Sequence, residues 1–161
     1  MGVHRLEPAE WERLRAIRLE ALSDAPGAFG SSVEREQAYD EVRWRELLAW
    51  GPWWVAEEDG SDVGLVAGEA PADRSPVVYS MWVRAEFRGT GAAAAMLDAV
   101  VAWAVADGAD SLWLTVTDRA PRARAFYERF GFVTWGTPEP LDRDPAISTS
   151  KMVLDLTRRR A

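Results

Sequence analysis

The stretch from Val77 to Leu97 holds the residues whose types and spacing best suit chemistry. It reads as an apolar strand, a short loop with Arg88, Gly89 and Gly91, and then an alanine-rich helix. Glycines let the backbone turn tightly and direct several N–H groups at one point, and a helix N-terminus adds the positive end of its dipole. Arg88 adds a full positive charge, and no acidic residue follows it before Asp98. This pattern predicts a site for a phosphate or pyrophosphate group.

The same two glycines also fit an ordinary turn between a strand and a helix, with a solvated arginine beside it. The loop lacks the lysine of a P-loop and does not have the spacing of the dinucleotide-binding fingerprint. A nucleoside triphosphatase is therefore disfavoured.

Composition excludes several other chemistries. The chain has 161 residues, no cysteine and a single histidine, His4. Disulfides, thiolate zinc sites and cysteine nucleophiles are thus excluded, and we expect neither a metal site nor a Ser-His-Asp triad. The formal charge of −7 argues against a nucleic-acid partner, because phosphate backbones need a basic surface. Without an apolar run of about 20 residues or a leader peptide, we expect a cytoplasmic protein that does not bind membranes.

Hydrophobic periodicity and turn residues predict the elements that position the loop. Strands are expected at residues 3–6, 53–57, 63–68, 77–83, 112–116, 132–135 and 151–156, and helices near 7–22, 42–50, 92–106 and 121–130. Asp59-Gly60 predicts a hairpin turn, and a proline-rich loop is expected from Pro138 to Pro145. This order predicts an α/β (α+β) fold with a central mixed, mostly antiparallel twisted sheet of six to seven strands flanked by about four helices. We expect one domain over residues 1–157 and a basic C-terminal tail at 158–161.

Two motifs give the sequence a resemblance to a known family. Residues 88–93, Arg-Gly-Thr-Gly-Ala-Ala, resemble the coenzyme A pyrophosphate motif of the GNAT superfamily of N-acetyltransferases. Leu114 to Val116, followed by Phe126, Tyr127 and then Gly131-Phe132, resemble the later strand and helix of that family. Two motifs in the right order are more specific than either alone, and the match is sharp from about residue 77 to 132. The resemblance implies the GNAT fold, in which the two central strands are splayed.

The resemblance implies an acetyl-CoA-dependent N-acetyltransferase without a metal. The acetyl group would pass to a primary amine of a small molecule or peptide by direct attack on the thioester. Tyr127 would be the general acid for the departing thiolate. The residues implied in coenzyme binding are Trp82, Val83, Arg88, Gly89, Thr90, Gly91, Ala92, Ala93, Arg122 and Tyr127. The sequence departs from the family at Ala120, where many members have an asparagine that contacts the coenzyme, and Asp118 or Arg122 is a candidate to compensate.

The general base and the acceptor site are less sharply indicated. The strand at 77–83 lacks the glutamate that some relatives carry. The candidates for the general base are therefore Glu69, Glu34, Glu36 or a chain of ordered water. Of these, we assign the role to Glu69. By the same resemblance, Phe29, Ser31 and Glu34 would bind the acceptor, together with the loop at 137–150. Acidic residues near the predicted acceptor side would suit a cationic amine: Glu34, Glu36, Asp40 and Glu41.

Two alternatives remain open on the sequence. A non-catalytic acyl-CoA-binding sensor on the same fold would explain Ala120 and the missing strand carboxylate, although Tyr127 speaks against it. A scaffold that has lost the coenzyme conflicts with the intact Arg88, Gly89 and Gly91. The sequence does not decide whether the chain forms a homodimer, which acceptor it uses, or whether the acyl group is longer than acetyl.

Overall fold

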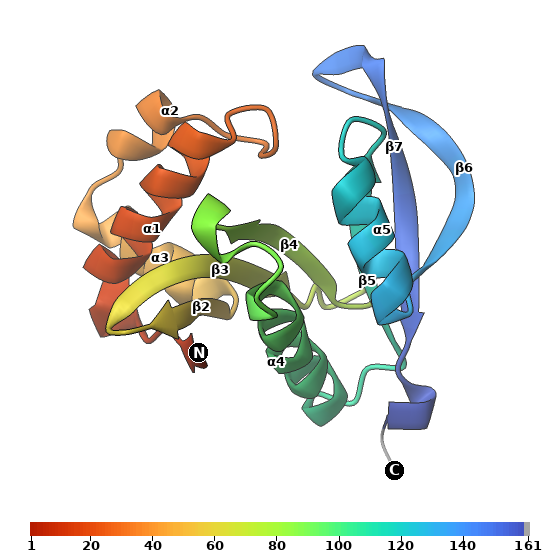
Figure 1. Ribbon diagram of the computed structural model, residues 1–161, viewed down its shortest axis with the longest axis horizontal. Coiled ribbons are helices and arrows are strands. Elements are labelled where there is room, and N and C mark those ends of the chain that lie inside the picture. Colours follow the sequence, from red (N-terminus) through yellow and green to blue (C-terminus); the bar gives the residue numbers. More distant parts are fainter. Residues whose placement is uncertain (160–161) are drawn as a thin grey trace. The chain divides into compact units, whose positions relative to one another are not determined.

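The computed structural model describes residues 1–159 (Figure 1), and the last two residues of the expected basic tail lie outside that range. The helices are α1 (Trp11–Asp24), α2 (Val33–Gln37), α3 (Glu41–Trp50), α4 (Ala92–Ala106) and α5 (Pro121–Phe130). The strands are β1 (Gly2–Arg5), β2 (Trp53–Glu58), β3 (Ser61–Glu69), β4 (Val77–Val83), β5 (Ser111–Thr117), β6 (Val133–Leu141) and β7 (Asp144–Asp155). Short 3-10 helices occur at η1 (Pro8–Glu10), η2 (Ala85–Phe87) and η3 (Thr157–Arg159).

The strands form a seven-stranded sheet in the order β1-β2-β3-β4-β5-β7-β6. The pair β4 and β5 is parallel, whereas β1 with β2, β2 with β3, β5 with β7 and β6 with β7 are antiparallel. The predicted mixed, mostly antiparallel sheet with flanking helices is confirmed. The described residues contain five α-helices, and the short α2 is the one that lies outside the four predicted ranges. Ser32 caps α2 by accepting a hydrogen bond from the Arg35 N–H at 3.2 Å.

The chain divides into two compact units. The first comprises Met1–Glu69 and Ser80–Val100, and the second comprises Ala70–Tyr79 and the chain from Val101 onward. The single domain over residues 1–157 and the splay of the central strands stay predictions.

The core of the first unit lies between the strands β2 and β3 and the helices α1 and α3. Four tryptophans of this unit are buried, Trp44, Trp53, Trp54 and Trp82, whereas Trp50 is exposed. Trp44, Trp53 and Trp82 pack with Leu14 and other apolar residues in one cluster. Their main contribution is thus to bury the inner face of α1.

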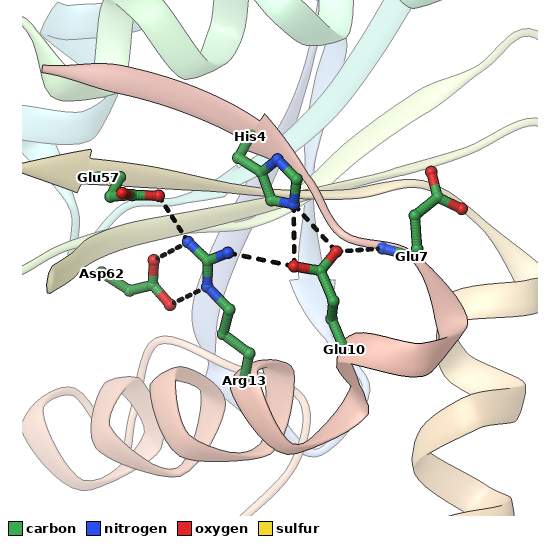
Figure 2. A network of polar contacts seen from close by, with 6 residues as sticks. All are labelled: His4, Glu7, Glu10, Arg13, Glu57 and Asp62. Atoms are coloured by element: carbon green, nitrogen blue, oxygen red, sulfur yellow. Dashed lines mark hydrogen bonds and ion pairs between the residues drawn. The ribbon is translucent and has the colours of Figure 1, made fainter. Parts of the chain in front are cut away.

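A polar network on the first unit joins α1 to the sheet (Figure 2). Arg13 donates hydrogen bonds to Asp62 at 2.7 and 2.8 Å, to Glu57 at 2.8 Å and to Glu10 at 3.1 Å. The Asp62 carboxylate is the main reason that the pKa of Arg13 is raised. The imidazole of His4, the only histidine in the chain, contacts the Glu10 carboxylate at 2.9 Å. This histidine is therefore part of the polar network.

Gly64 in β3 sets how closely β3 approaches the end of β4. A Cβ atom there would lie 2.9 Å from the Trp82 carbonyl oxygen, which is backbone, and 2.9 Å from the Met96 side chain. We expect Gly64→Ala to lower the free energy of unfolding by about 1 to 3 kcal/mol, because an overpacked site forces the backbone to shift. Thermal unfolding checks this, with Gly2→Ala as the control, since a Cβ at Gly2 meets nothing within 4 Å. Equal melting temperatures for the two variants would contradict the expectation.

The second unit contains the hairpin of β6 and β7, which is longer than predicted. Pro138 and Pro140 lie inside β6, so the expected proline-rich loop is wrong over most of its length. Because β6 is the last strand of the sheet, its outer N–H groups need no partner, and proline is tolerated there. The loop expected at 137–150 as part of the acceptor site is therefore mostly strand.

Candidate functional site

The loop between η2 and α4 has the backbone conformation that the sequence predicted. Gly89 and Gly91 have φ angles of 80° and 94°, which side-chain-bearing residues rarely adopt. A Cβ at either position would meet nothing within 4 Å. Glycine is therefore required by the backbone conformation and not by a lack of space for a side chain. The Ala95 N–H donates to the Gly91 carbonyl at 2.9 Å and closes the first turn of α4.

The amides of this loop point to an anion site. Among residues 1–159, the N–H groups of Gly89, Gly91, Ala92 and Ala93 donate no hydrogen bond to a backbone carbonyl outside the helix. The first N–H groups of a helix lack partners within the helix, and the helix dipole adds positive potential there. Several donors at one helix start fit a phosphate or pyrophosphate group. The residues present therefore fit the diphosphate of coenzyme A.

Arg88 is engaged by protein groups on both sides. Its Nε donates to the Val83 carbonyl at 2.9 Å, and its Nη2 donates to the Asp24 carboxylate at 2.8 Å. The same Asp24 oxygen accepts from the Trp82 indole N–H at 2.9 Å. The hydrogen bond from Trp82, and then the contact with Arg88, lower the pKa of Asp24. Arg88 thus joins the end of β4 to the end of α1, and its charge is shared with Asp24.

Sequence reasoning missed Asp24, which contacts two residues of the candidate site, Trp82 and Arg88. It lies 64 residues before Arg88 and 58 residues before Trp82. No local pattern relates such distant positions. The only signal in the sequence was the helical period of α1. It places Asp24 on the last turn before Pro26-Gly27 ends the helix.

Trp82 and Val83, expected to contact the pantetheine arm through their backbone, form the buried end of β4. The following Arg84 N–H donates to the Val63 carbonyl at 2.8 Å, which fixes this end of β4 against β3. Thr90 donates from its hydroxyl to the Phe87 carbonyl at 2.6 Å and so closes η2 onto the loop.

Tyr127 belongs to the second unit, on α5. Its side chain is buried and packs against Phe126 at 5.3 Å and Phe132 at 5.7 Å between ring centroids. Burial raises the pKa of Tyr127 to about 12. The phenol is therefore protonated throughout the neutral range and is available there as a proton donor.

The raised pKa of Tyr127 predicts a loss of stability in alkali. The ordinary value is 10.0, so between pH 10 and 12 the unfolded chain releases a proton that the folded chain retains. The contribution is complete below pH 10 and is lost as the pH rises through 12, on the order of 2 kcal/mol in all. Urea unfolding at pH 9 and 11.5 measures it. The Tyr127→Phe variant should lose less stability than the wild type over this interval, and equal losses would contradict the buried phenol.

The predicted acceptor residues lie in the first unit but in different environments. Phe29 is buried in the apolar cluster of α1, while Glu34 is exposed on α2. The Ser31 hydroxyl oxygen is buried without a hydrogen-bond partner among residues 1–159, so an incoming polar group could satisfy it. Their role in binding an acceptor stays a prediction.

The structure separates the candidate bases. Both Glu36 carboxylate oxygens accept hydrogen bonds from Arg18 at 2.9 Å, which removes Glu36 from the candidates. Glu69 is exposed at the end of β3, two residues after the buried Ala67. Because alternate residues share a face of a strand, Glu69 extends from the face on which Ala67 packs with α1.

The start of α5 reflects the departure at Ala120. Ala120 occupies the N-cap position, and its methyl group makes no hydrogen bond to the helix N-terminus. Arg122 is exposed in the first turn, and Asp118 donates its N–H to the Ser148 carbonyl at 2.9 Å. Compensation for the asparagine by either residue stays a prediction.

Over the described part of the chain, no three histidine, cysteine, aspartate or glutamate side chains gather in a way that could hold a metal ion. No helix in residues 1–159 is long and apolar enough to cross a membrane.

Comparison with known proteins identifies similar sequences and folds. The model of the acetyltransferase (GNAT) family matches residues 11–132. An uncharacterized N-acetyltransferase of Mycobacterium tuberculosis is 38% identical over 86 residues, which cover 52% of this chain and 53% of that protein. The match thus spans about half the length of that relative.

Solved structures share the fold at low identity. A GNAT acetyltransferase from Streptococcus pneumoniae has a TM-score of 0.78 at 18% identity and covers 96% of this chain and 98% of its own. A Salmonella typhimurium protein solved with its cofactor acetyl-CoA has a TM-score of 0.75 at 15% identity, with 97% and 94% covered.

Proposed function

Because the chain belongs to the acetyltransferase (GNAT) family, we propose that it transfers an acetyl group from acetyl-CoA to a primary amine of a small molecule or peptide. The observation that carries the proposal is the loop before α4, where two glycines have positive φ and four N–H groups donate no backbone hydrogen bond within the described residues. Those donors suit the diphosphate of the coenzyme. The Salmonella typhimurium neighbour, which has a similar fold, was solved with acetyl-CoA.

In the proposed reaction, a neutral amine nitrogen attacks the thioester carbonyl carbon. A new C–N bond forms, the C–S bond breaks, and the thiolate leaves with its electron pair and takes up a proton. We assign this proton to Tyr127 and the stabilisation of the carbonyl oxygen to the Val83 N–H. Glu69, directly or through water, accepts the proton that the amine must lose. Backbone groups of Trp82 and Val83 hold the pantetheine arm.

Arg88 contributes mainly by position in this scheme. Its two contacts, to Val83 and Asp24, hold the beginning of the glycine loop against the end of β4. The amides of Gly91, Ala92 and Ala93 then supply most of the hydrogen bonds to the diphosphate. Arg122, exposed on the first turn of α5, is assigned to the outer phosphates.

Calorimetric titration with acetyl-CoA and with free CoA tests the binding half of the proposal. Binding of both, followed by release of thiol in the presence of a panel of amines, is the expected result. No heat at millimolar ligand would overturn the transferase.

A sensor that binds acyl-CoA without turnover is the second candidate, supported by Ala120 in place of the family's usual asparagine and by the absence of a glutamate in β4. It predicts tight coenzyme binding with no thiol release for any amine. Ala120→Asn separates the two functions: in the transferase it should strengthen binding and preserve turnover, whereas in the sensor turnover stays absent.

A further inference from the structure

Ser80 in β4 has an unusual backbone conformation. Its φ is 56°, and the other non-glycine residue with positive φ among residues 1–159 is Asp59, in the turn of the β2-β3 hairpin. A turn explains Asp59, but Ser80 lies inside a strand. Non-glycine residues stay in this region only where the surrounding structure holds them.

A buried arginine contacts Ser80 directly. Arg18 of α1 donates from Nη1 to the Ser80 hydroxyl oxygen at 3.0 Å. Its Nε and Nη2 bind the two oxygens of Glu36 at 2.9 Å each, and both side chains are buried. The guanidinium carbon lies 4.8 Å from the centre of the Phe29 ring. One guanidinium therefore joins α1, α2, the segment between them and β4.

The contact is one of three between α1 and the alternate residues Ser80, Trp82 and Arg84, of which the last lies just beyond the end of β4. Asp24 accepts from the Trp82 indole, and Glu20 accepts from Arg84 at 2.7 and 2.8 Å. The side chains of Asp24 and Glu20 are each 40% exposed, so water screens these two contacts. Among the three α1 side chains in these contacts only Arg18 is buried, and it reaches the half-buried Ser80, whose conformation is unfavourable.

We propose that Arg18 is a positioning residue for acetyl transfer. Through Ser80 it holds the course of β4 just before Trp82 and Val83, whose backbone is assigned to the pantetheine arm and the thioester. Through Glu36 and Phe29 it holds the segment that carries the predicted acceptor residues. This inference rests on the proposed function, because the groups being positioned are those that the function assigns.

The test compares Ser80→Ala with Ser80→Gly. Both variants remove the hydroxyl, but only glycine adopts a φ of 56° without strain. Ser80→Ala is expected to lower kcat by about 10- to 100-fold, because a small displacement of the reacting groups is costly. Ser80→Gly should remain within about threefold of the wild type, since the conformation no longer needs to be held. Equal kcat values for alanine and glycine would overturn the proposal.

A second set of variants tests Arg18 itself. Replacing the buried pair together, Arg18→Met with Glu36→Met, leaves no unpaired charge and preserves folding. This double variant should lower kcat and raise the acceptor KM, and adding Ser80→Gly should recover kcat but not the acceptor KM. Absence of that recovery would contradict a role through Ser80. Glu20→Gln is the matched control, because it weakens the exposed contact with Arg84 and should change kcat by less than about twofold.

Hydrogen exchange separates this inference from the proposed function. Amides of residues 80–84 should exchange faster in Ser80→Ala and in the Arg18/Glu36 double variant than in the wild type, whatever the ligand. If the wild type failed to bind acetyl-CoA, the proposed function would fall while the exchange result still decided whether Arg18 holds β4. If the wild type turned over normally and exchange was unchanged in both variants, the role of Arg18 alone would be refuted.

Discussion

Gly91→Val is expected to weaken acetyl-CoA binding by about 100-fold or more, because two or more charge-assisted hydrogen bonds to the diphosphate would be lost or misdirected. Gly91 has a φ of 94°, which a β-branched residue cannot adopt without strain. The valine variant must therefore change the backbone at the start of α4. The amides of Gly91, Ala92 and Ala93 then no longer converge on one point. Calorimetric titration of the folded variant with acetyl-CoA measures the effect.

Gly108 provides the matched control at the other end of the same helix. Its φ is 84°, and a Cβ there would also meet nothing within 4 Å. Gly108→Val carries the same backbone cost, on the order of 1 to 3 kcal/mol, but lies away from the proposed phosphate site. It should lower the melting temperature about as much as Gly91→Val and leave the affinity for acetyl-CoA near that of the wild type. Equal loss of affinity in both variants would show that general destabilisation, and not the loop, weakens binding.

The glycine loop was predictable because its signals are local. A positive φ, a helix start and the absence of nearby acidic residues all follow from residues within one turn of each other. The same holds for the Asp59-Gly60 turn, and for α4 and α5, whose bounds match those predicted. Such features depend on neighbours in sequence, so a single chain suffices to find them.

The contacts that hold the site depend on residues far apart in sequence. Glu36 lies 18 positions after Arg18, and Ser80 lies 62 positions after it. Nothing in the local sequence patterns relates these three residues. Glu36 illustrates the result, since the sequence suggested a base and the structure shows a paired carboxylate.

The prediction of a proline-rich loop where β6 and β7 form a hairpin was wrong for a different reason. Proline usually ends a strand, but the rule does not apply at the open edge of a sheet, and edge position is a tertiary property.

The chemistry of Tyr127 follows from its burial. A pKa of about 12 keeps the phenol protonated at neutral pH. A free thiol has a pKa of about 8.5, so the phenol does not give up its proton before the C–S bond begins to break. In the proposed reaction it would act first as a hydrogen-bond donor to the sulfur, and the proton would move as negative charge accumulates there. In apolar surroundings the charged thiolate is disfavoured, which makes it a stronger base and assists the transfer.

Tyr127→Phe is accordingly expected to lower kcat by about 100- to 10,000-fold while the affinity for acetyl-CoA changes little. Phenylalanine retains the ring that packs against Phe126 and Phe132, so the fold is preserved and only the hydroxyl is lost. An interaction made only in the transition state lowers kcat and kcat/KM equally, and this pattern distinguishes an acid from a packing residue. Steady-state thiol release and coenzyme titration on the same preparation measure both quantities. An unchanged kcat would assign the proton to water, whereas a weakened affinity with normal kcat would make Tyr127 a binding residue.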